Sequence, residues 1–170
     1  KELIKTRNGE IVAPVPIEEA LLARAPALSR VVVLGDRRDY VVALVTLQQE
    51  GANGLEPGTG KLAGLARDVA SQATTVEDAA NDVAWETCLL DAVKDVNANA
   101  VACPSKASRV KKVAILPRDF SVATDEMTPT LKIRRSQVEA RHAATLETMF
   151  AAKTADVVFL NSEAAALVKA

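Results

Sequence analysis

The chain has 170 residues, enough to bury a hydrophobic core and typical of a single domain. Hydrophobic residues make up 49% of it but aromatic residues only 3%, so alanine, valine and leucine must fill the core. The 21 basic and 22 acidic side chains leave a net charge of -1, which argues against a nucleic-acid-binding surface, and no apolar run approaches the length of a membrane span.

The N-terminal segment predicts a β-hairpin followed by a helix. Leu3–Thr6 and Ile11–Ala13 are short extended pieces joined through Asn8–Gly9, and both turn residues tolerate positive φ. Prolines end the second strand, and Pro16 is suited to lead into a helix. Apolar residues then recur at helical spacing until Pro26, namely at Ile17, Ala20, Leu21 and Ala25.

Two further apolar runs predict a second hairpin, because each is too short for a helix and is rich in β-branched residues. They are Val31–Leu34 and Val41–Leu47, with the polar segment Gly35–Asp39 between them. Both runs are apolar nearly throughout, which predicts that both faces of the sheet are covered. The glycines of 51–60 follow as a loop, and without a Gly-Lys-Ser/Thr ending they do not predict a phosphate-binding loop.

From Lys61 to Val101 the pattern predicts helices. The segment Thr74–Asp78 fits an N-cap with an acidic first turn, since a threonine oxygen can accept a free backbone N–H. Trp85 lies one turn before Leu89 and is expected to pack on the same face. Two apolar stripes support the prediction: Leu62, Leu65, Ala66 and Val69, and then Leu89, Val93, Val96 and Ala100.

The C-terminal half predicts a third buried strand, a loop and a last helix. The strand is Val113–Leu116, the loop is Ser121–Thr130, and the helix is Ser136–Phe150. Taken with the preceding elements, these features predict an α+β fold. Its expected form is a small domain with an N-terminal β-hairpin and a small mixed sheet flanked by helices.

The domain is expected to cover residues 1–150, and residues 151–170 form a C-terminal tail of uncertain structure. Within the tail, Val157–Leu160 has the pattern of a strand. Glu163–Val168 has the pattern of a short helix. The tail therefore either docks on the domain or extends from it.

The segment Thr128–Arg135 places Lys132 on an approach stiffened by Pro129, with arginines directly behind it. A lysine ammonium on a loop is a compact point charge that suits phosphate or carboxylate groups. Such charge runs are also common at solvated helix starts. On residue types alone, the solvated helix start is the better interpretation.

Other reactive side chains give weaker signals. His142, the only histidine, lacks a nucleophile near it in the sequence, so we expect it on the surface of the last helix. Asp119 and the pair Asp125–Glu126 are assigned no catalytic role, because adjacent carboxylates in a loop seldom converge on one substrate atom. Cys88 and Cys103 lack metal-type spacing, which predicts free thiols in a reducing compartment and no metal site.

Several motifs in chain order resemble a known family. The opening segment Lys1–Glu18 is similar to the core motif that begins the C-terminal domain of adenylate-forming enzymes. Gly35–Arg38, Ala114–Ser121 and Thr128–Arg135 resemble the pattern of the long-chain fatty-acid–CoA ligases (acyl-CoA synthetases), and most closely that of their bubblegum-like branch. The resemblance covers residues 1–150.

This resemblance implies a small lid domain that swivels against the protein's own N-terminal adenylation domain. One pose activates a fatty acid with ATP to an acyl-adenylate, and the other forms the thioester with coenzyme A as substrate. By motif position, Lys132 matches the catalytic adenylation lysine and Lys1 matches the hinge. Gly9 and Glu10 match the loop that faces the active site during thioester formation, where glycine lets the pantetheine chain come close. ATP and Mg²⁺ are expected to bind mainly to the N-terminal domain.

The resemblance therefore implies an ATP-dependent, AMP-forming acid–thiol ligase in the cytoplasm, with peripheral membrane attachment left open. The 170 residues alone are expected to be inactive. One alternative is an adenylate-forming ligase for another carboxylic acid, since chain-length selection would lie outside these residues. Another is a non-catalytic module that binds a protein partner through its hairpin and charged loops. A phosphate-binding loop encoded upstream would favour the enzyme.

Overall fold

A four-stranded mixed sheet forms the centre of the protein. In the computed structural model, which describes residues 2–154 and 157–160, the strands lie in the order β3 (Leu28–Leu34), β4 (Val41–Leu47), β5 (Val110–Ile115) and β6 (Val158–Leu160). β3 and β4 are antiparallel, whereas β5 is parallel to β4 and β6 is parallel to β5. The predicted hairpin and third strand are thus confirmed, and the start of the tail adds an edge strand.

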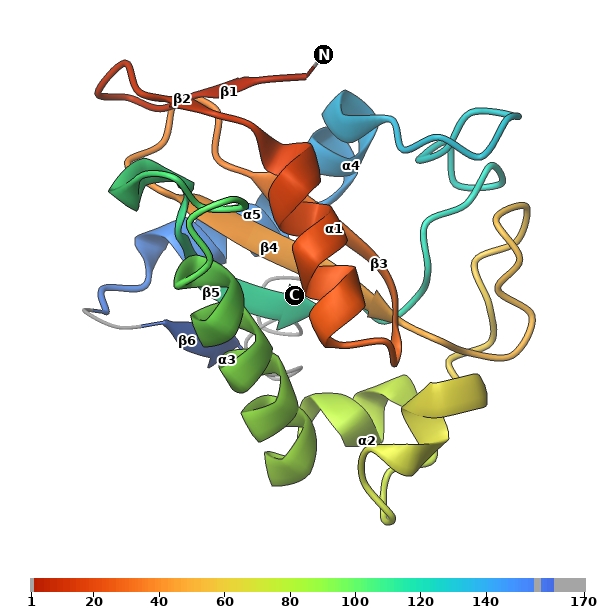
Figure 1. Ribbon diagram of the computed structural model, residues 1–170. Coiled ribbons are helices and arrows are strands. Elements are labelled where there is room, and N and C mark those ends of the chain that lie inside the picture. The colour runs from red at the N-terminus through yellow and green to blue at the C-terminus, as the bar shows by residue number, and fades with distance from the viewer. Residues whose placement is uncertain (1, 155–156, 161–170) are drawn as a thin grey trace.

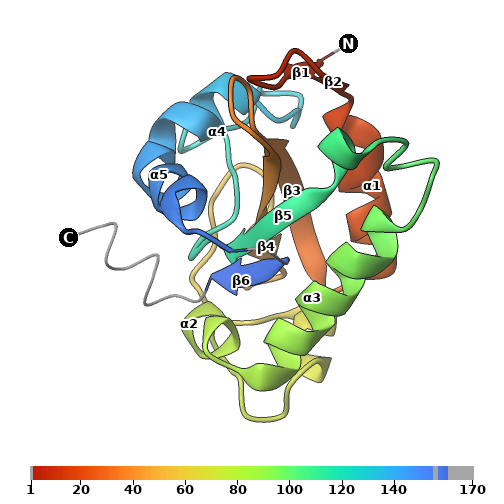
Figure 2. The ribbon, with the colours of Figure 1, turned by 90° about the vertical axis from the view of Figure 1, so that its left-hand side faces the viewer.

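Both faces of the sheet are covered by helices, as the apolar runs predicted. The helices are α1 (Pro14–Arg24), α3 (Val83–Asn97), α4 (Arg135–Arg141) and α5 (Ala143–Ala151). Val33 belongs to a buried cluster with residues of α1 and α3, whereas its neighbour Val32 belongs to a second cluster with residues of α4 and α5. Figure 2 shows the strands between these two pairs of helices. Every residue of β4 is buried as a result.

The predicted N-terminal hairpin consists of β1 (Ile4–Lys5) and β2 (Ile11–Val12). Gly9 in its turn has a φ of 83°, which glycine adopts without steric strain. The hairpin docks on the turn between β3 and β4, where the Arg7 N–H donates to the Arg38 carbonyl at 2.9 Å. This contact fixes the hairpin at one end of the sheet, and α1 begins directly after it (Figure 1).

The segment predicted as helical from residue 61 to 101 is helical only in part. It contains a short 3-10 helix, η1 (Gly64–Asp68), then α2 (Val76–Ala80) and α3. Leu62 is extended rather than helical, because it pairs with Gln49 in an antiparallel bridge. The first apolar stripe therefore imitates helical spacing without forming an α-helix.

The prediction is confirmed at the start of α2 and along α3. Thr75 caps α2 through a capping box, in which its Oγ1 accepts from the Asp78 N–H and the Asp78 carboxylate accepts from the Thr75 N–H, both at 3.1 Å. Trp85 and Leu89 are buried on the same face of α3. Ala100 lies beyond the end of α3 and is exposed, so the second stripe is shorter than predicted.

The expected last helix over 136–150 is instead two helices, α4 and α5, which meet at His142. The φ of −105° and ψ of 22° at this residue are not helical. A second 3-10 helix, η2 (Lys106–Ser108), precedes β5. The architecture confirms the α+β class, whereas the helix predicted at 163–168 lies outside the described residues. Within the described ranges, no helix is long and apolar enough to cross a bilayer.

Candidate functional site

Lys132 lies in a short loop of residues 127–133, the lysine loop, which leads into α4. Met127 and Ile133 pair in an antiparallel bridge at its base. Across the loop, the Thr128 N–H donates to the Lys132 carbonyl at 2.8 Å, and the Lys132 N–H donates to the Thr128 hydroxyl at 3.1 Å. The backbone that presents Lys132 is therefore fixed by hydrogen bonds, although it lies at the surface.

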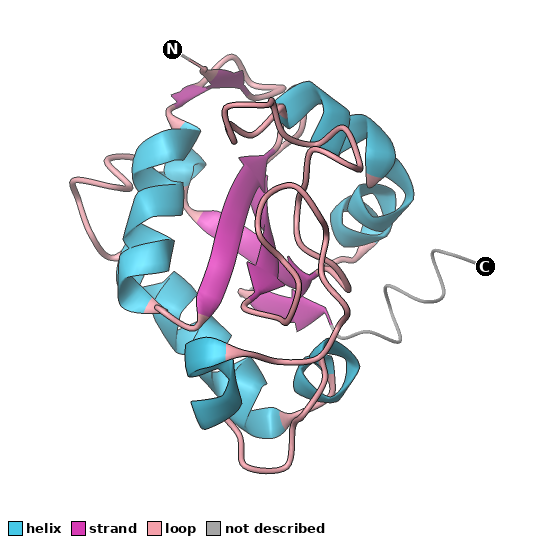
Figure 3. Cartoon of the chain, turned by 90° about the vertical axis from the view of Figure 1, so that its right-hand side faces the viewer, coloured by secondary structure: helices cyan, strands magenta, loops and turns pink. Residues whose placement is uncertain are grey.

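The glycine loop, residues 51–60, supports the segment that leads to the lysine loop. The Val122 N–H donates to the Gly54 carbonyl at 2.8 Å, and the Asp119 N–H donates to the Pro57 carbonyl at 2.9 Å. Gly54 has a φ of 85°, a backbone conformation that glycine adopts without strain, and it lies beside the Leu131 side chain. Figure 3 shows several loop segments gathered in front of the sheet on this side.

The Lys132 side chain is exposed and forms no hydrogen bond or ion pair with the residues that the structure describes. The neighbouring cations are different. Arg134 forms an ion pair with Asp125, and Arg135 forms ion pairs with Glu18 and Glu2. Within Lys132–Arg135, the lysine is thus the charge that remains available to an anion from outside the described chain.

Arg135 ties the start of α4 to α1 and β3. Its Nη1 and Nη2 lie 2.6 and 3.1 Å from the two oxygens of Glu18, and Nη1 also donates to the Val33 carbonyl at 2.8 Å. Burial alone would lower the pKa of Arg135, but hydrogen bonds and charges from Glu18 and Glu2 outweigh it and raise the pKa. The interpretation of this segment as a solvated helix start is therefore wrong for Arg135.

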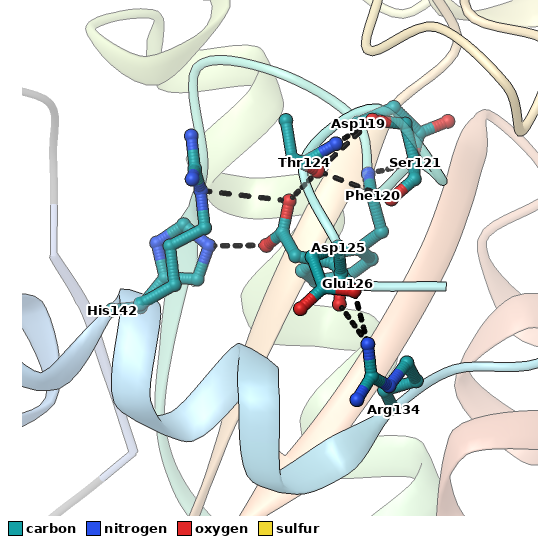
Figure 4. Close-up of polar contacts among 9 residues, drawn as sticks. Asp119, Phe120, Ser121, Thr124, Asp125, Glu126, Arg134 and His142 are labelled. Carbon is teal, nitrogen blue, oxygen red and sulfur yellow. Dashed lines mark hydrogen bonds and ion pairs between the residues drawn. The ribbon is translucent and has the colours of Figure 1, made fainter. Parts of the chain in front are cut away.

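His142 is not the surface residue that the sequence suggested. Its Nε2 lies 2.6 Å from Oε2 of Glu126, and the two side chains are 18% and 4% exposed. The Thr124 hydroxyl donates to the other Glu126 oxygen, and the Arg141 Nε lies 3.7 Å from that oxygen. Figure 4 shows the His142 side chain directed at this carboxylate from the α4–α5 junction. Sequence reasoning missed the pair because 16 positions separate its members.

The Asp119 side chain is engaged in hydrogen bonds within the fold. It is buried and accepts hydrogen bonds from the Thr46 hydroxyl at 2.7 Å, from the Phe120 N–H at 2.8 Å and from the Ser29 hydroxyl. These contacts hold the segment that follows β5 against the hairpin of β3 and β4. Both oxygens of this carboxylate are occupied by the protein itself.

The residues predicted for the thioester-forming pose lie at the N-terminal hairpin. Gly9 is at the turn, where nothing lies within 4 Å of the position that a side chain would take, and Glu10 is exposed. Figure 1 draws this turn and the segment leading into α4 on different sides of the molecule, so the two candidate surfaces are separate. Lys1, the predicted hinge, lies outside the described residues, and its neighbour Glu2 pairs with Arg135.

A family model for the C-terminal domain of AMP-binding enzymes matches residues 1–154. The chain belongs to this family. It is 34% identical over 156 residues to the long-chain-fatty-acid–CoA ligase ACSBG1 of Mus musculus, and 34% identical over 150 residues to the long-chain-fatty-acid–CoA ligase FadD15 of Mycobacterium tuberculosis. Each match covers 88% of this chain but only 21% and 23% of the relative. The chain thus spans about a fifth of the length of these curated relatives.

Solved structures confirm the fold of this AMP-binding C-terminal domain. The adenylation domain of a carboxylic acid reductase from Segniliparus rugosus, in complex with AMP and a carboxylic acid, matches 88% of this chain and 20% of its own with a TM-score of 0.60 at 20% identity. The adenylation domain of a carboxylate reductase from Mycobacterium chelonae matches 88% of this chain and 19% of its own with a TM-score of 0.62 at 19% identity. At these identities the likeness concerns the fold alone.

The AMP-binding C-terminal domain has no group of three His, Cys, Asp or Glu side chains that could hold a metal ion within the part of the chain that the structure describes. Cys88 and Cys103 are free, as expected. Burial raises the pKa of both thiols, so they are largely protonated at neutral pH and are poor nucleophiles.

Proposed function

We propose that this chain is the C-terminal domain of a long-chain-fatty-acid–CoA ligase. Such an enzyme joins a fatty acid to AMP at the expense of ATP and then transfers the acyl group to coenzyme A. The observation that carries the proposal is Lys132, which is exposed on a hydrogen-bonded loop and has no partner among the described residues. The relatives of the chain in mouse and Mycobacterium tuberculosis are named as long-chain-fatty-acid–CoA ligases.

Lys132 would act in the first half-reaction. A fatty-acid carboxylate oxygen bonds to the α-phosphorus of ATP while the bond from that phosphorus to the bridging oxygen breaks and pyrophosphate leaves. Negative charge lies on both reacting groups, so an ammonium beside them stabilises the transition state. A contact of about 4 Å contributes roughly 4 kcal/mol at an effective dielectric near 20, before desolvation.

The remaining components of the reaction would come from the N-terminal adenylation domain with which C-terminal domains of this family pair. Mg²⁺ would neutralise charge on the ATP phosphates. Because the described residues contain no cluster of metal ligands, they do not fit a metal site of their own, and the ligands of Mg²⁺ would belong to ATP and to the other domain.

The second half-reaction would use the N-terminal hairpin. The turn at Gly9 is open, so its backbone can approach a narrow chain such as the pantetheine arm of coenzyme A. The turn at Gly9 and the segment leading into α4 lie on different sides of the molecule in Figure 1, which supports a swivel about the chain start, near Lys1, that presents one surface at a time. Glu10, exposed beside Gly9, would face the site in this pose.

The test is Lys132→Ala in the full-length enzyme that contains this domain. Adenylation, followed as exchange of pyrophosphate into ATP with a long-chain fatty acid, is expected to slow by about 10²-fold, the usual scale for one preorganised contact. Thioester formation from supplied acyl-adenylate should change less than about threefold, since Lys132 acts before that step.

Lys94→Ala is the matched control, because Lys94 is an exposed lysine on α3. It should leave both half-reactions unchanged. Equal losses in both half-reactions of Lys132→Ala would contradict the role of Lys132. Comparing acids of different chain length and class with the same enzyme then decides the substrate class.

A further inference from the structure

Glu126 lies at the root of the lysine loop and is buried, with 3% of its surface exposed. A carboxylate is stable in such surroundings only when other groups bind its oxygens. His142 and Thr124 form hydrogen bonds to the two oxygens, and Arg141 adds a cation at 3.7 Å. Both oxygens of this carboxylate are thus bound by other side chains of the domain.

Two of the partners of Glu126 lie at the junction between α4 and α5. His142 is the residue at which α4 ends and α5 begins, and Arg141 is the last residue of α4. The His142 ring also packs against the Phe120 ring in a T-shaped arrangement, with ring centroids 6.2 Å apart. The side chain of Glu126 therefore joins the root of the loop to the point where the covering helix is broken (Figure 4).

The backbone of Glu126 closes the lysine loop. Its carbonyl accepts from the Arg134 N–H at 2.8 Å, directly outside the bridge between Met127 and Ile133. Residue 126 is thus held on one side by the far end of the loop and on the other side by the helix junction. A rotation of the loop root would break the contact with His142, so the two anchors fix the direction in which the loop projects.

We propose that Glu126 is a positioning residue for Lys132, acting together with His142. The proposal rests on the proposed function, since it concerns the orientation of the adenylation lysine. A displacement of about 1 Å in a reacting group can lower a rate by 10²-fold, so an anchor at the loop root can affect catalysis without touching substrate. The alternative is that the buried cluster only stabilises the domain.

The experiment compares half-reactions in the full-length enzyme. Glu126→Gln keeps the size of the side chain but removes its charge. It should slow adenylation by about 10-fold and change thioester formation by less than about twofold, since a loosened loop misplaces only the lysine. His142→Gln, which keeps an amide donor, is the second variant and should slow adenylation by about threefold.

The matched control is Asp119→Asn, another buried carboxylate whose partners are hydroxyl and backbone groups. It should lower the unfolding midpoint without changing the ratio of the two half-reactions. If Glu126→Gln and His142→Gln lower both half-reactions equally, as this control predicts for a purely structural role, the positioning role is overturned.

A double-mutant cycle provides the decisive readout. In the Lys132→Ala background, Glu126→Gln should slow adenylation by less than twofold, because the group that it positions is gone. A further loss of about 10-fold in that background would overturn the proposal. A normal rate for Glu126→Gln alone would also overturn it while leaving the proposed function intact, whereas a normal rate for Lys132→Ala would overturn the proposed function itself.

Discussion

Lys112 and Lys132 carry the same ammonium group in opposite surroundings. Lys112 lies on β5 beneath α5, is 1% exposed, and donates to the Tyr40 hydroxyl at 2.5 Å and to the backbone carbonyls of Met149 and Ala152. Its charge also lies 4.9 Å from the centre of the Tyr40 ring. Lys132 is exposed and has no such partner among the described residues.

The difference shows that the fold uses one of these two ammonium groups and leaves the other exposed. The carbonyls of Met149 and Ala152 belong to the C-terminal end of α5, where helical carbonyls lack partners and the helix dipole is negative. Lys112 satisfies that end, so its ammonium is unavailable to a substrate. Lys132 is supported through its backbone instead, which leaves the ammonium available to an anion supplied by another domain or by substrate.

The largest expected effect comes from reversing the charge of the exposed lysine. Lys132→Glu in the full-length enzyme should slow adenylation by about 10³-fold, the upper end for a single preorganised contact, because attraction becomes repulsion. The free energy of unfolding of the 170-residue chain should change by less than about 0.5 kcal/mol, as for other surface substitutions. Pyrophosphate exchange and urea denaturation provide the two measurements. A marked loss of stability would mean that Lys132 also serves the fold.

A substitution at the Arg135–Glu18 ion pair tests whether Arg135 differs in role from the nearby Lys132. Arg135 lies three positions after Lys132, but its guanidinium is held by Glu18, and their side chains are 14% and 12% exposed. Glu18→Gln should lower the free energy of unfolding by about 3 kcal/mol, because it weakens a nearly buried ion pair. Urea denaturation measures the effect, and Glu19→Gln, at an exposed position on the same helix, is the control. Equal stabilities of the two variants would contradict a structural role for the pair.

The smallest effect is expected for the buried lysine. Lys112→Met should destabilise the chain by about 2 kcal/mol, because the carbonyls that end α5 lose their donor while the burial of an ammonium is relieved. The folded full-length variant should retain its adenylation rate. Lys111→Met, at the exposed neighbouring position, should be close to neutral in urea denaturation. A Lys112→Met enzyme that is stable but slow in adenylation would contradict the assignment of Lys112 to the fold.

Local sequence patterns predicted the parts of the fold that depend on local chemistry. The Asn8–Gly9 turn and the Thr75 cap are specified by residues a few positions apart, and both are present. The apolar spacing from Leu62 to Val69 misled the prediction, because the pairing of Leu62 with Gln49 outweighs helical periodicity. Tertiary contact decided the structure in this segment.

In the candidate site, too, local sequence predicted some features, whereas others depend on tertiary contact. The exposure of Lys132 follows from a polar, proline-containing segment, and the resemblance suggested its role. The pairs Glu126–His142 and Arg135–Glu18 could not be predicted, since their members are 16 and 117 positions apart and meet only when α4 packs on the sheet. Reading His142 from its sequence neighbours alone therefore assigned it to the surface.

The parallel pairing of β5 and β6 has a consequence for the lysine loop. Two adjacent parallel strands cannot be joined by a tight turn. After β5 the chain must therefore return to the other end of the sheet before β6 can begin. The lysine loop, α4 and α5 lie on that return path. The segment that carries Lys132 is therefore part of the connection between two strands of the sheet. Shortening this segment would remove the helices that cover one face of the sheet and would prevent β6 from pairing with β5. The fold and the lysine loop can therefore only be altered together.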